Sequence, residues 1–133
     1  VFAAATSVAK VGRLAGCLER LDALVLNRSE AAILAGEAPV ADMARALAAD
    51  LRPGGVVLVS DGGNQAALAK GGDCVTASPP PLELARANGA GDAMAATLFW
   101  GLTATPAAGL AAHLDAALAA GADFAAGRQA EQN

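Results

Sequence analysis

The chain has 133 residues, enough for one domain with a buried core but short for an enzyme that must enclose two substrates. Its formal net charge is −4 and only 3% of its residues are aromatic, and no cluster of Lys and Arg stands out, which argues against a nucleic-acid-binding surface. Hydrophobic residues reach 55%, yet Gly, Pro or a charge interrupts every stretch within the ~18 residues that a membrane-spanning helix needs, so we expect a soluble protein with a small-molecule partner.

The first third of the chain predicts strands that alternate with helices. Residues 1–5 are apolar and predict a strand, and apolar residues at helical spacing then predict an amphipathic helix capped by Ser7. Residues 23–26, ALVL, predict a second strand. The helix that follows is expected to be capped by Ser29 and to end at Gly36.

The middle of the chain predicts a helix and then three strands. Residues 40–51 place their apolar side chains on one face and predict a helix that ends before Pro53. Residues 55–60, GVVLVS, form a continuous run typical of a parallel strand buried on both faces. Residues 65–70 and 73–78, separated by two glycines, predict a hairpin at the edge of a sheet.

The last third predicts two helices, one beginning after the glycines of residues 89–91 and one opened by Pro106. Strands alternating with helices indicate the α/β class, with a mostly parallel sheet, flanking helices and an edge hairpin. We therefore expect one domain over residues 1–127 and a frayed tail over residues 128–133.

Polar or glycine-rich segments follow two of the expected strands, at residues 27–30 and 60–63, and a third precedes the helix after residue 89. In open α/β sheets, ligands bind at the carboxyl ends of the strands. The sequence therefore predicts a ligand site at this edge.

The segment Gly89-Ala90-Gly91-Asp92 carries the sharpest chemical signal. Its glycines allow close approach of a ligand, and the following helix offers free N–H groups and the positive end of its dipole, which suits a phosphate. Asp92 would be charged near neutral pH and could accept a hydroxyl proton. The alternative is a glycine-rich linker followed by an Asp that only complements the helix dipole.

Two longer segments carry a family resemblance. NGAGDAMAATLF at residues 88–99 and LNRSEAAILAG at residues 26–36 resemble the GAGD and NxxE elements of the PfkB, or ribokinase-like, carbohydrate kinases. Residues 5–14 and 21–31 are similar to pseudouridine kinase-like members, so the resemblance covers residues 1–127. It implies the nucleotide-side, C-terminal half of an enzyme that uses ATP and Mg²⁺ to phosphorylate a hydroxyl of a sugar or nucleoside, with pseudouridine the favoured acceptor.

The resemblance also implies roles for individual residues. Asp92 would be the catalytic base, and backbone N–H groups would form an anion hole for the migrating phosphoryl group, supplied by Gly89, Ala90 and Gly91. Asn27 and Glu30 would organise Mg²⁺, through water, and the nucleotide phosphates. For these two residues, helix capping is the alternative interpretation.

Further residues would lie near the nucleotide. Ser60 and Gly62 match a strand-end Thr-x-Gly of the family, for which a plain turn is the alternative, and Asn88 stands where the family usually has Thr. Residues 117–121 correspond to a region that lines the adenine pocket, although small residues there more often permit close helix packing. His113 is expected at the surface and receives no role.

The sequence also departs from the family. Asp61 brings a carboxylate near the phosphates, where it would repel ATP unless it turned outward, and Gln65 replaces a second glycine. Residues 85–87, Ala-Arg-Ala, lack the acidic side chains that the family usually has just before the GAGD element. We expect the family's sugar-binding half and lid strands to be missing from this sequence, which would leave the chain nearly inactive and prone to self-association.

The residues leave one further interpretation open and exclude another. The chain could instead be a non-catalytic nucleotide-binding or interaction module that kept the fold of a kinase. A P-loop fold is set aside because the sequence has no GxxxxGK[ST] pattern.

Cys17 and Cys74 are far apart and form no CxxC pair, so we expect a reducing, cytoplasmic setting.

Overall fold

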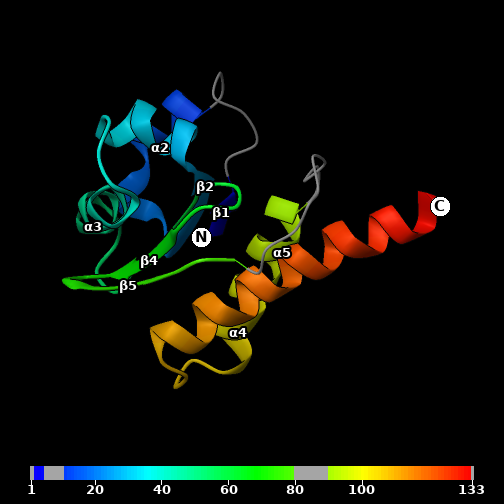
Figure 1. The fold of residues 1–133 in the computed structure, drawn as a ribbon. Coiled ribbons are helices and arrows are strands. Elements are labelled where there is room, and N and C mark those ends of the chain that lie inside the picture. The colour runs from blue at the N-terminus through cyan, green and yellow to red at the C-terminus, as the bar shows by residue number, and fades with distance from the viewer. Residues whose placement is uncertain (1, 5–10, 80–89, 133) are drawn as a thin grey trace.

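The computed structural model describes residues 2–4, 11–79 and 90–132, and the side chains of 93–122 within the last range. Five strands form one sheet in the order β1-β2-β3-β4-β5 (Figure 1). Their bounds are Phe2–Ala4, Ala23–Asn27, Val56–Ser60, Ala66–Lys70 and Asp73–Ala77. The strands β1, β2 and β3 run parallel, whereas β4 and β5 form an antiparallel hairpin at the edge. The α/β class and the edge hairpin expected from the sequence are confirmed.

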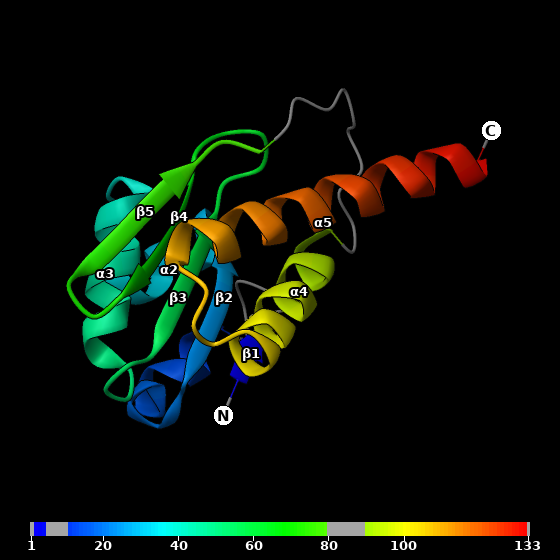
Figure 2. The same cartoon turned by 90° about the horizontal axis from the view of Figure 1, so that it is seen from below.

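Helices cover both faces of the sheet (Figure 2). The 3₁₀ helices η1 (Gly12–Gly16) and η2 (Leu18–Arg20) lie on one face with α2 (Arg28–Ala35) and α3 (Val40–Asp50). The helices α4 (Ala90–Ala104) and α5 (Leu110–Gln132) lie on the other face, where α4 packs against β1 and β2 and α5 against β4 and β5. Within the described ranges, no helix combines the length and apolar character needed to cross a membrane.

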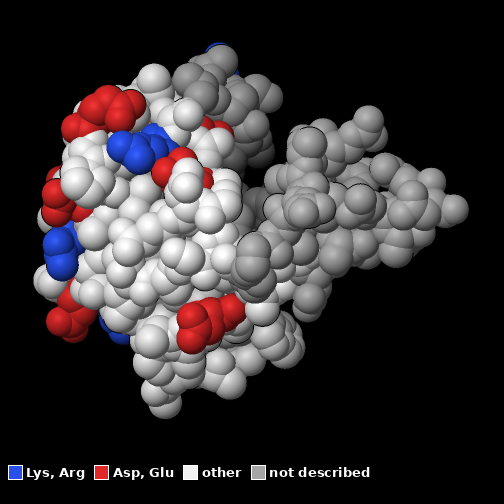
Figure 3. Space-filling model, in the orientation of Figure 1, with Lys and Arg blue, Asp and Glu red and all other residues white. Residues whose placement is uncertain are grey.

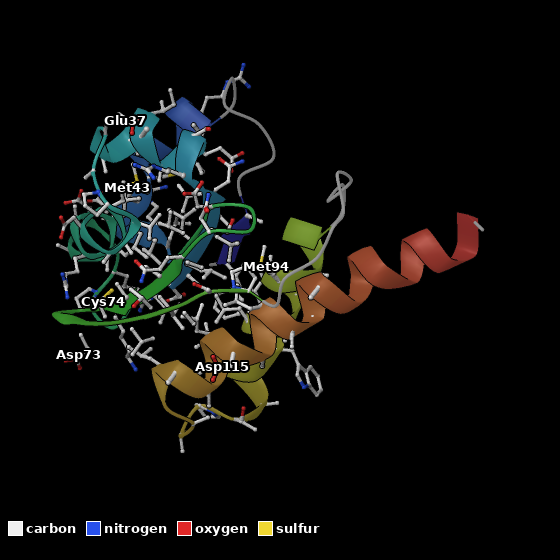
Figure 4. All side chains as sticks on the ribbon, in the orientation of Figure 1. Glu37, Met43, Asp73, Cys74, Met94 and Asp115 are labelled. Atoms are coloured by element: carbon white, nitrogen blue, oxygen red, sulfur yellow. The ribbon has the colours of Figure 1, made fainter. Side chains whose placement is uncertain are left out.

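Alternate residues of the central strands supply two separate cores, because successive strand side chains point to opposite faces. On the α3 face, Leu24 and Val57 join Met43, which points inward from the helix in Figure 4. On the α4–α5 face, Leu58 packs with Leu98. All four apolar residues of β3 are at most 3% exposed, which explains why its sequence shows no polar alternation.

Two of the predicted helix starts are wrong. The helix after β2 begins at Arg28 and its N-cap is Asn27, not Ser29. The helix α5 begins at Leu110 rather than Pro106, because the Ala108 N–H bonds back to the carbonyl of Thr105 at 3.0 Å and closes a turn first. It then continues through Gln132, past the point where fraying was expected.

The described part of the segment after β1 forms 3₁₀ helices instead of the expected amphipathic α-helix. Residues 12–20 form two 3₁₀ segments, in which the Cys17 N–H bonds to the Leu14 carbonyl at 2.9 Å and the Leu21 N–H to the Leu18 carbonyl at 3.0 Å. Glycines at both ends of the first segment disfavour a longer α-helix by about 1 kcal/mol each. The expected cap, Ser7, lies outside the described residues.

Candidate functional site

Asn27 ends β2, and Glu30 lies in the first turn of α2; together they form a reciprocal capping box at the start of this helix. The Glu30 N–H donates to Oδ1 of Asn27 at 2.8 Å, and the Asn27 N–H donates to Oε1 of Glu30 at 2.9 Å. Glu30 is only 5% exposed. The capping interpretation of this pair is therefore confirmed, and one oxygen of each side chain is already engaged with the backbone.

Capping leaves part of both side chains unused. Within the described residues, neither Nδ2 of Asn27 nor Oε2 of Glu30 has a hydrogen-bond partner. A nearly buried carboxylate with one free oxygen could hold a metal-bound water, because Mg²⁺ keeps several of its waters in proteins. The cap and a role toward a ligand are thus compatible in geometry.

The end of β3 lies level with the end of β2, because Asn27 pairs with Ser60 in the parallel register. After Ser60 the chain turns, and the Asn64 N–H donates to the Asp61 carbonyl at 2.9 Å. Gly62 has a φ of 58°, a conformation that side chains with a Cβ rarely adopt. Gly62 is therefore needed for the turn, and its expected contact with a nucleotide stays a prediction, as does that of Ser60.

Arg28 links these two strand ends through an ion pair, and it was not among the residues expected at the site from the sequence. Its Nη1 lies 3.3 Å from Oδ2 of Asp61, and its Nη2 lies 3.9 Å from Oε2 of Glu37. Glu37 lies on the outside of the α2–α3 connection (Figure 4). Parallel register could have revealed the pair, since Arg28 follows Asn27 and Asp61 follows Ser60. The carboxylate expected to repel phosphates is therefore paired with a guanidinium.

A shallow hollow of about 290 Å³ adjoins this ion pair. It is lined by Arg28, Pro39, Val40, Asp61, Asn64 and Gln65. Figure 3 shows acidic and basic side chains interspersed over the α2–α3 side of the molecule. Gln65, which replaces a family glycine, thus contributes a polar wall beside the strand ends.

The third segment expected at the ligand site, residues 88–92, leads into α4. Asn88 and Gly89 lie outside the described residues, and the side chains of Ala90 and Asp92 are likewise not among those described. The backbone of α4 begins at Ala90, on the side of the sheet where β2 and β3 end (Figures 1 and 2). The helix start and the two strand ends therefore share one edge, as expected, and the individual roles at residues 88–92 stay predictions.

The prediction that His113 lies at the surface is wrong. It is 6% exposed between α4 and α5, and its Nε2 is buried with no hydrogen-bond partner among the described residues. A Cβ on Gly101 would lie 2.8 Å from its Nδ1, so the imidazole packs directly on the glycine backbone. Ala117 is fully buried in the same core, which agrees with close helix packing for the segment 117–121.

The two cysteines are free, and both are partly buried. Burial raises the pKa of the Cys74 thiol above its usual value, an effect that Arg45 opposes. Cys74 lies on β5 with its Sγ 4.0 Å from the Ala41 carbonyl (Figure 4). This environment favours an unreactive structural thiol.

Comparison with known proteins agrees with this geometry. The sequence profile described as pfkB family carbohydrate kinase matches residues 5–128. No curated protein matches the chain.

Solved structures match over most of the chain. An apo adenosine kinase from Trypanosoma brucei brucei is 19% identical with a TM-score of 0.78, over 93% of this chain and 42% of that one. A carbohydrate kinase from Agrobacterium tumefaciens is 28% identical with a TM-score of 0.72, over 91% and 38%. A putative ribokinase II from E. coli, in complex with ATP and Mg²⁺, is 19% identical with a TM-score of 0.67, over 82% and 34%. The chain therefore spans about two fifths of the length of such structures.

Proposed function

Because the chain belongs to the pfkB family of carbohydrate kinases, we propose that it supplies the nucleotide-binding side of an enzyme that transfers a phosphoryl group from ATP to a hydroxyl of a sugar or nucleoside. The observation that carries this proposal is that the carboxyl ends of β2 and β3 and the start of α4 lie at the same end of the sheet. There, Asn27 lies opposite Ser60, and the start of α4 lies on the same side (Figure 2). A helix start of this kind binds phosphate groups.

We assign the residues at this end of the sheet different roles in phosphoryl transfer. Backbone N–H groups of Gly89, Ala90 and Gly91 hold the migrating phosphoryl group, which carries its charge on peripheral oxygens. Asp92 accepts the proton of the acceptor hydroxyl as that oxygen forms its bond to phosphorus and the bond to ADP breaks. Positioning of both reactants in line supplies most of the acceleration, so the backbone geometry matters as much as the base.

Asn27 and Glu30 fit a magnesium ion held through water. The capping box leaves Oε2 of Glu30 without a partner among the described residues, and oxygen is the ligand atom that Mg²⁺ prefers. The side-chain oxygen of Asn27 already accepts the Glu30 N–H, which leaves the amide N–H of Asn27 for a phosphate. When bound, Mg²⁺ neutralises phosphate charge. Glu30 orients the water, and Asn27 directs its amide N–H toward a phosphate oxygen.

The acceptor is the least constrained part of the proposal. The matched structures include adenosine kinases, one from Schistosoma mansoni in complex with 2-fluoroadenosine, and also a putative sugar kinase from Clostridium perfringens, which supports a sugar or nucleoside. Pseudouridine rests on the sequence similarity of residues 5–14 and 21–31 alone. A cytoplasmic setting, where ATP is abundant, belongs to the same proposal.

One observation favours a second function, a nucleotide-binding module without turnover. Gln65 stands where the family pattern has a glycine, and its side chain lines the hollow beside Asp61. A bulky side chain there could hold a nucleotide in an unproductive position. Binding of ATP without measurable phosphoryl transfer, in a protein that also carries an acceptor-binding part, would favour this second function.

Titration calorimetry with ATP and Mg²⁺ tests the proposal. Gly91→Val should abolish binding, because its side chain would block the approach of a phosphate to the backbone. Gly109→Val is the control: it adds the same atoms in the α4–α5 connection, just before α5, where a Cβ would meet nothing within 4 Å among the described residues. Circular dichroism checks that both variants fold.

The outcomes separate cleanly. Loss of binding in Gly91→Val but not in Gly109→Val supports the proposed site. Equal binding by the wild-type protein and Gly91→Val would place the phosphate elsewhere. A folded wild-type protein that binds neither ATP nor ADP would refute nucleotide binding by this chain.

A further inference from the structure

Arg28 occupies a position that helix energetics do not explain. It is the first residue of α2, where the positive end of the helix dipole disfavours a cation. Its guanidinium nevertheless lies between two carboxylates, 3.3 Å from Asp61 and 3.9 Å from Glu37. The side chains of Arg28 and Asp61 are 43% and 26% exposed, and a pair so open to solvent adds little to stability.

The position of the pair suggests what it does. Asp61 directly follows Ser60 at the edge where the proposed function places the nucleotide phosphates. An uncompensated carboxylate there would repel a triphosphate, because like charges at a solvated surface still interact over several ångströms. Arg28 follows Asn27 on the neighbouring strand, and the parallel register of these strands brings the opposite charges together.

We propose that Arg28 is a charge-masking residue of the nucleotide site: by pairing with Asp61, it keeps the end of β3 permissive for a polyphosphate. The proposal rests on the proposed nucleotide binding. It makes Arg28 a positioning residue, which acts through Asp61 and touches neither the phosphates nor the acceptor.

Charge masking differs from a direct phosphate contact in one measurable respect. If Arg28 acts by neutralising Asp61, removal of both charges restores the site, because neither repulsion nor attraction remains. If Arg28 instead contacts a phosphate itself, removal of Asp61 cannot replace the lost contact. The variants Arg28→Ala, Asp61→Asn and the double variant therefore separate the two mechanisms.

A second ion pair in the same chain provides the control. Arg45 lies 3.6 Å from Asp42 on α3, with side chains 52% and 61% exposed, and α3 packs on the sheet away from α4. Arg45→Ala changes the net charge of the protein by the same amount as Arg28→Ala. Any effect of overall charge on nucleotide binding will therefore appear in both variants.

The experiment is titration calorimetry with ATP and with AMP at moderate salt, accompanied by thermal melts. Arg28→Ala should weaken ATP binding roughly five- to tenfold, as expected for one unit charge at a solvated distance of several ångströms. AMP, which carries fewer charges, should lose less. Asp61→Asn in the Arg28→Ala background should return ATP affinity to within about twofold of the wild-type value, and Arg45→Ala should leave it unchanged.

Each outcome decides the matter. Wild-type affinity in Arg28→Ala, or no recovery in the double variant, would overturn charge masking while leaving nucleotide binding intact. An equal loss in Arg45→Ala would assign the effect to overall charge and would also overturn the proposal. Absence of ATP binding in the folded wild-type protein would refute the proposed function itself, and the inference would fall with it.

Discussion

Asn27 should contribute to stability and to ligand binding by separable means. Its Oδ1 accepts the Glu30 N–H at 2.8 Å and caps α2. Replacing an N-cap Asn by Ala costs about 1 kcal/mol, and up to about 2. For a chain of this size, Asn27→Ala should lower the melting temperature by roughly 3–6 °C. Asn27→Ser keeps an acceptor oxygen and should stay within a few tenths of a kcal/mol of the wild type.

The two variants also divide the roles of the side chain. Ser caps the helix but lacks the amide group proposed to reach a phosphate, so Asn27→Ser should melt normally and yet bind ATP several-fold more weakly. Urea unfolding gives the free energies, and titration calorimetry gives the affinities. Normal ATP binding by Asn27→Ser would reduce Asn27 to a cap, and wild-type stability in Asn27→Ala would refute the assigned contribution of the capping box.

Four other changes have expected outcomes. Glu30→Gln should keep the cap and lower the Mg²⁺ dependence of ATP binding, measured by titration with and without Mg²⁺; an unchanged dependence would remove Glu30 from the metal site. Asp92→Asn, in a protein with turnover, should lower the rate about 10²–10⁴-fold with ATP affinity nearly intact, and normal turnover would exclude it as the base. Gly101→Ala should lose about 1–3 kcal/mol from its clash with buried His113, offset by up to about 1 kcal/mol of helix propensity; a variant more stable than the wild type in urea would contradict this packing. Alkylation of Cys74, followed by mass spectrometry, should accelerate only above the usual thiol pKa, because burial disfavours its thiolate; rapid reaction at neutral pH would show that the thiol is accessible and ionised.

The central fold could be predicted because several local signals agree there. The run at residues 55–60 is apolar without alternation, and β3 is indeed covered on both faces. The glycines between β4 and β5 allow a tight turn, in which Gly71 has a φ of 58°. The helix α3 buries the face that its spacing indicated, including Met43 and Leu47. In each case, one local pattern and the tertiary environment favour the same structure.

The errors occur where tertiary contacts or competing caps decide. Ser29 and Asn27 are both good N-caps, and only the reciprocal bond with Glu30 selects Asn27. His113 is polar and lies on a helix, yet Gly101 on the neighbouring helix has no side chain, so the imidazole packs against its backbone and is buried. No pattern within α5 could report a glycine on α4.

Asp61 shows how a departure from a family pattern changes meaning once strand register is known. In the sequence, a carboxylate after β3 counts against a phosphate site. In the fold, Asn27 and Ser60 are partners in adjacent parallel strands, so the residues that follow them, Arg28 and Asp61, meet at 3.3 Å. The local charge is then balanced by a residue 33 positions away in the chain. In chains of this topology, an acidic residue directly after β3 should therefore permit full nucleotide binding when a basic residue directly follows β2, and should weaken that binding several-fold when the position after β2 is neutral or acidic.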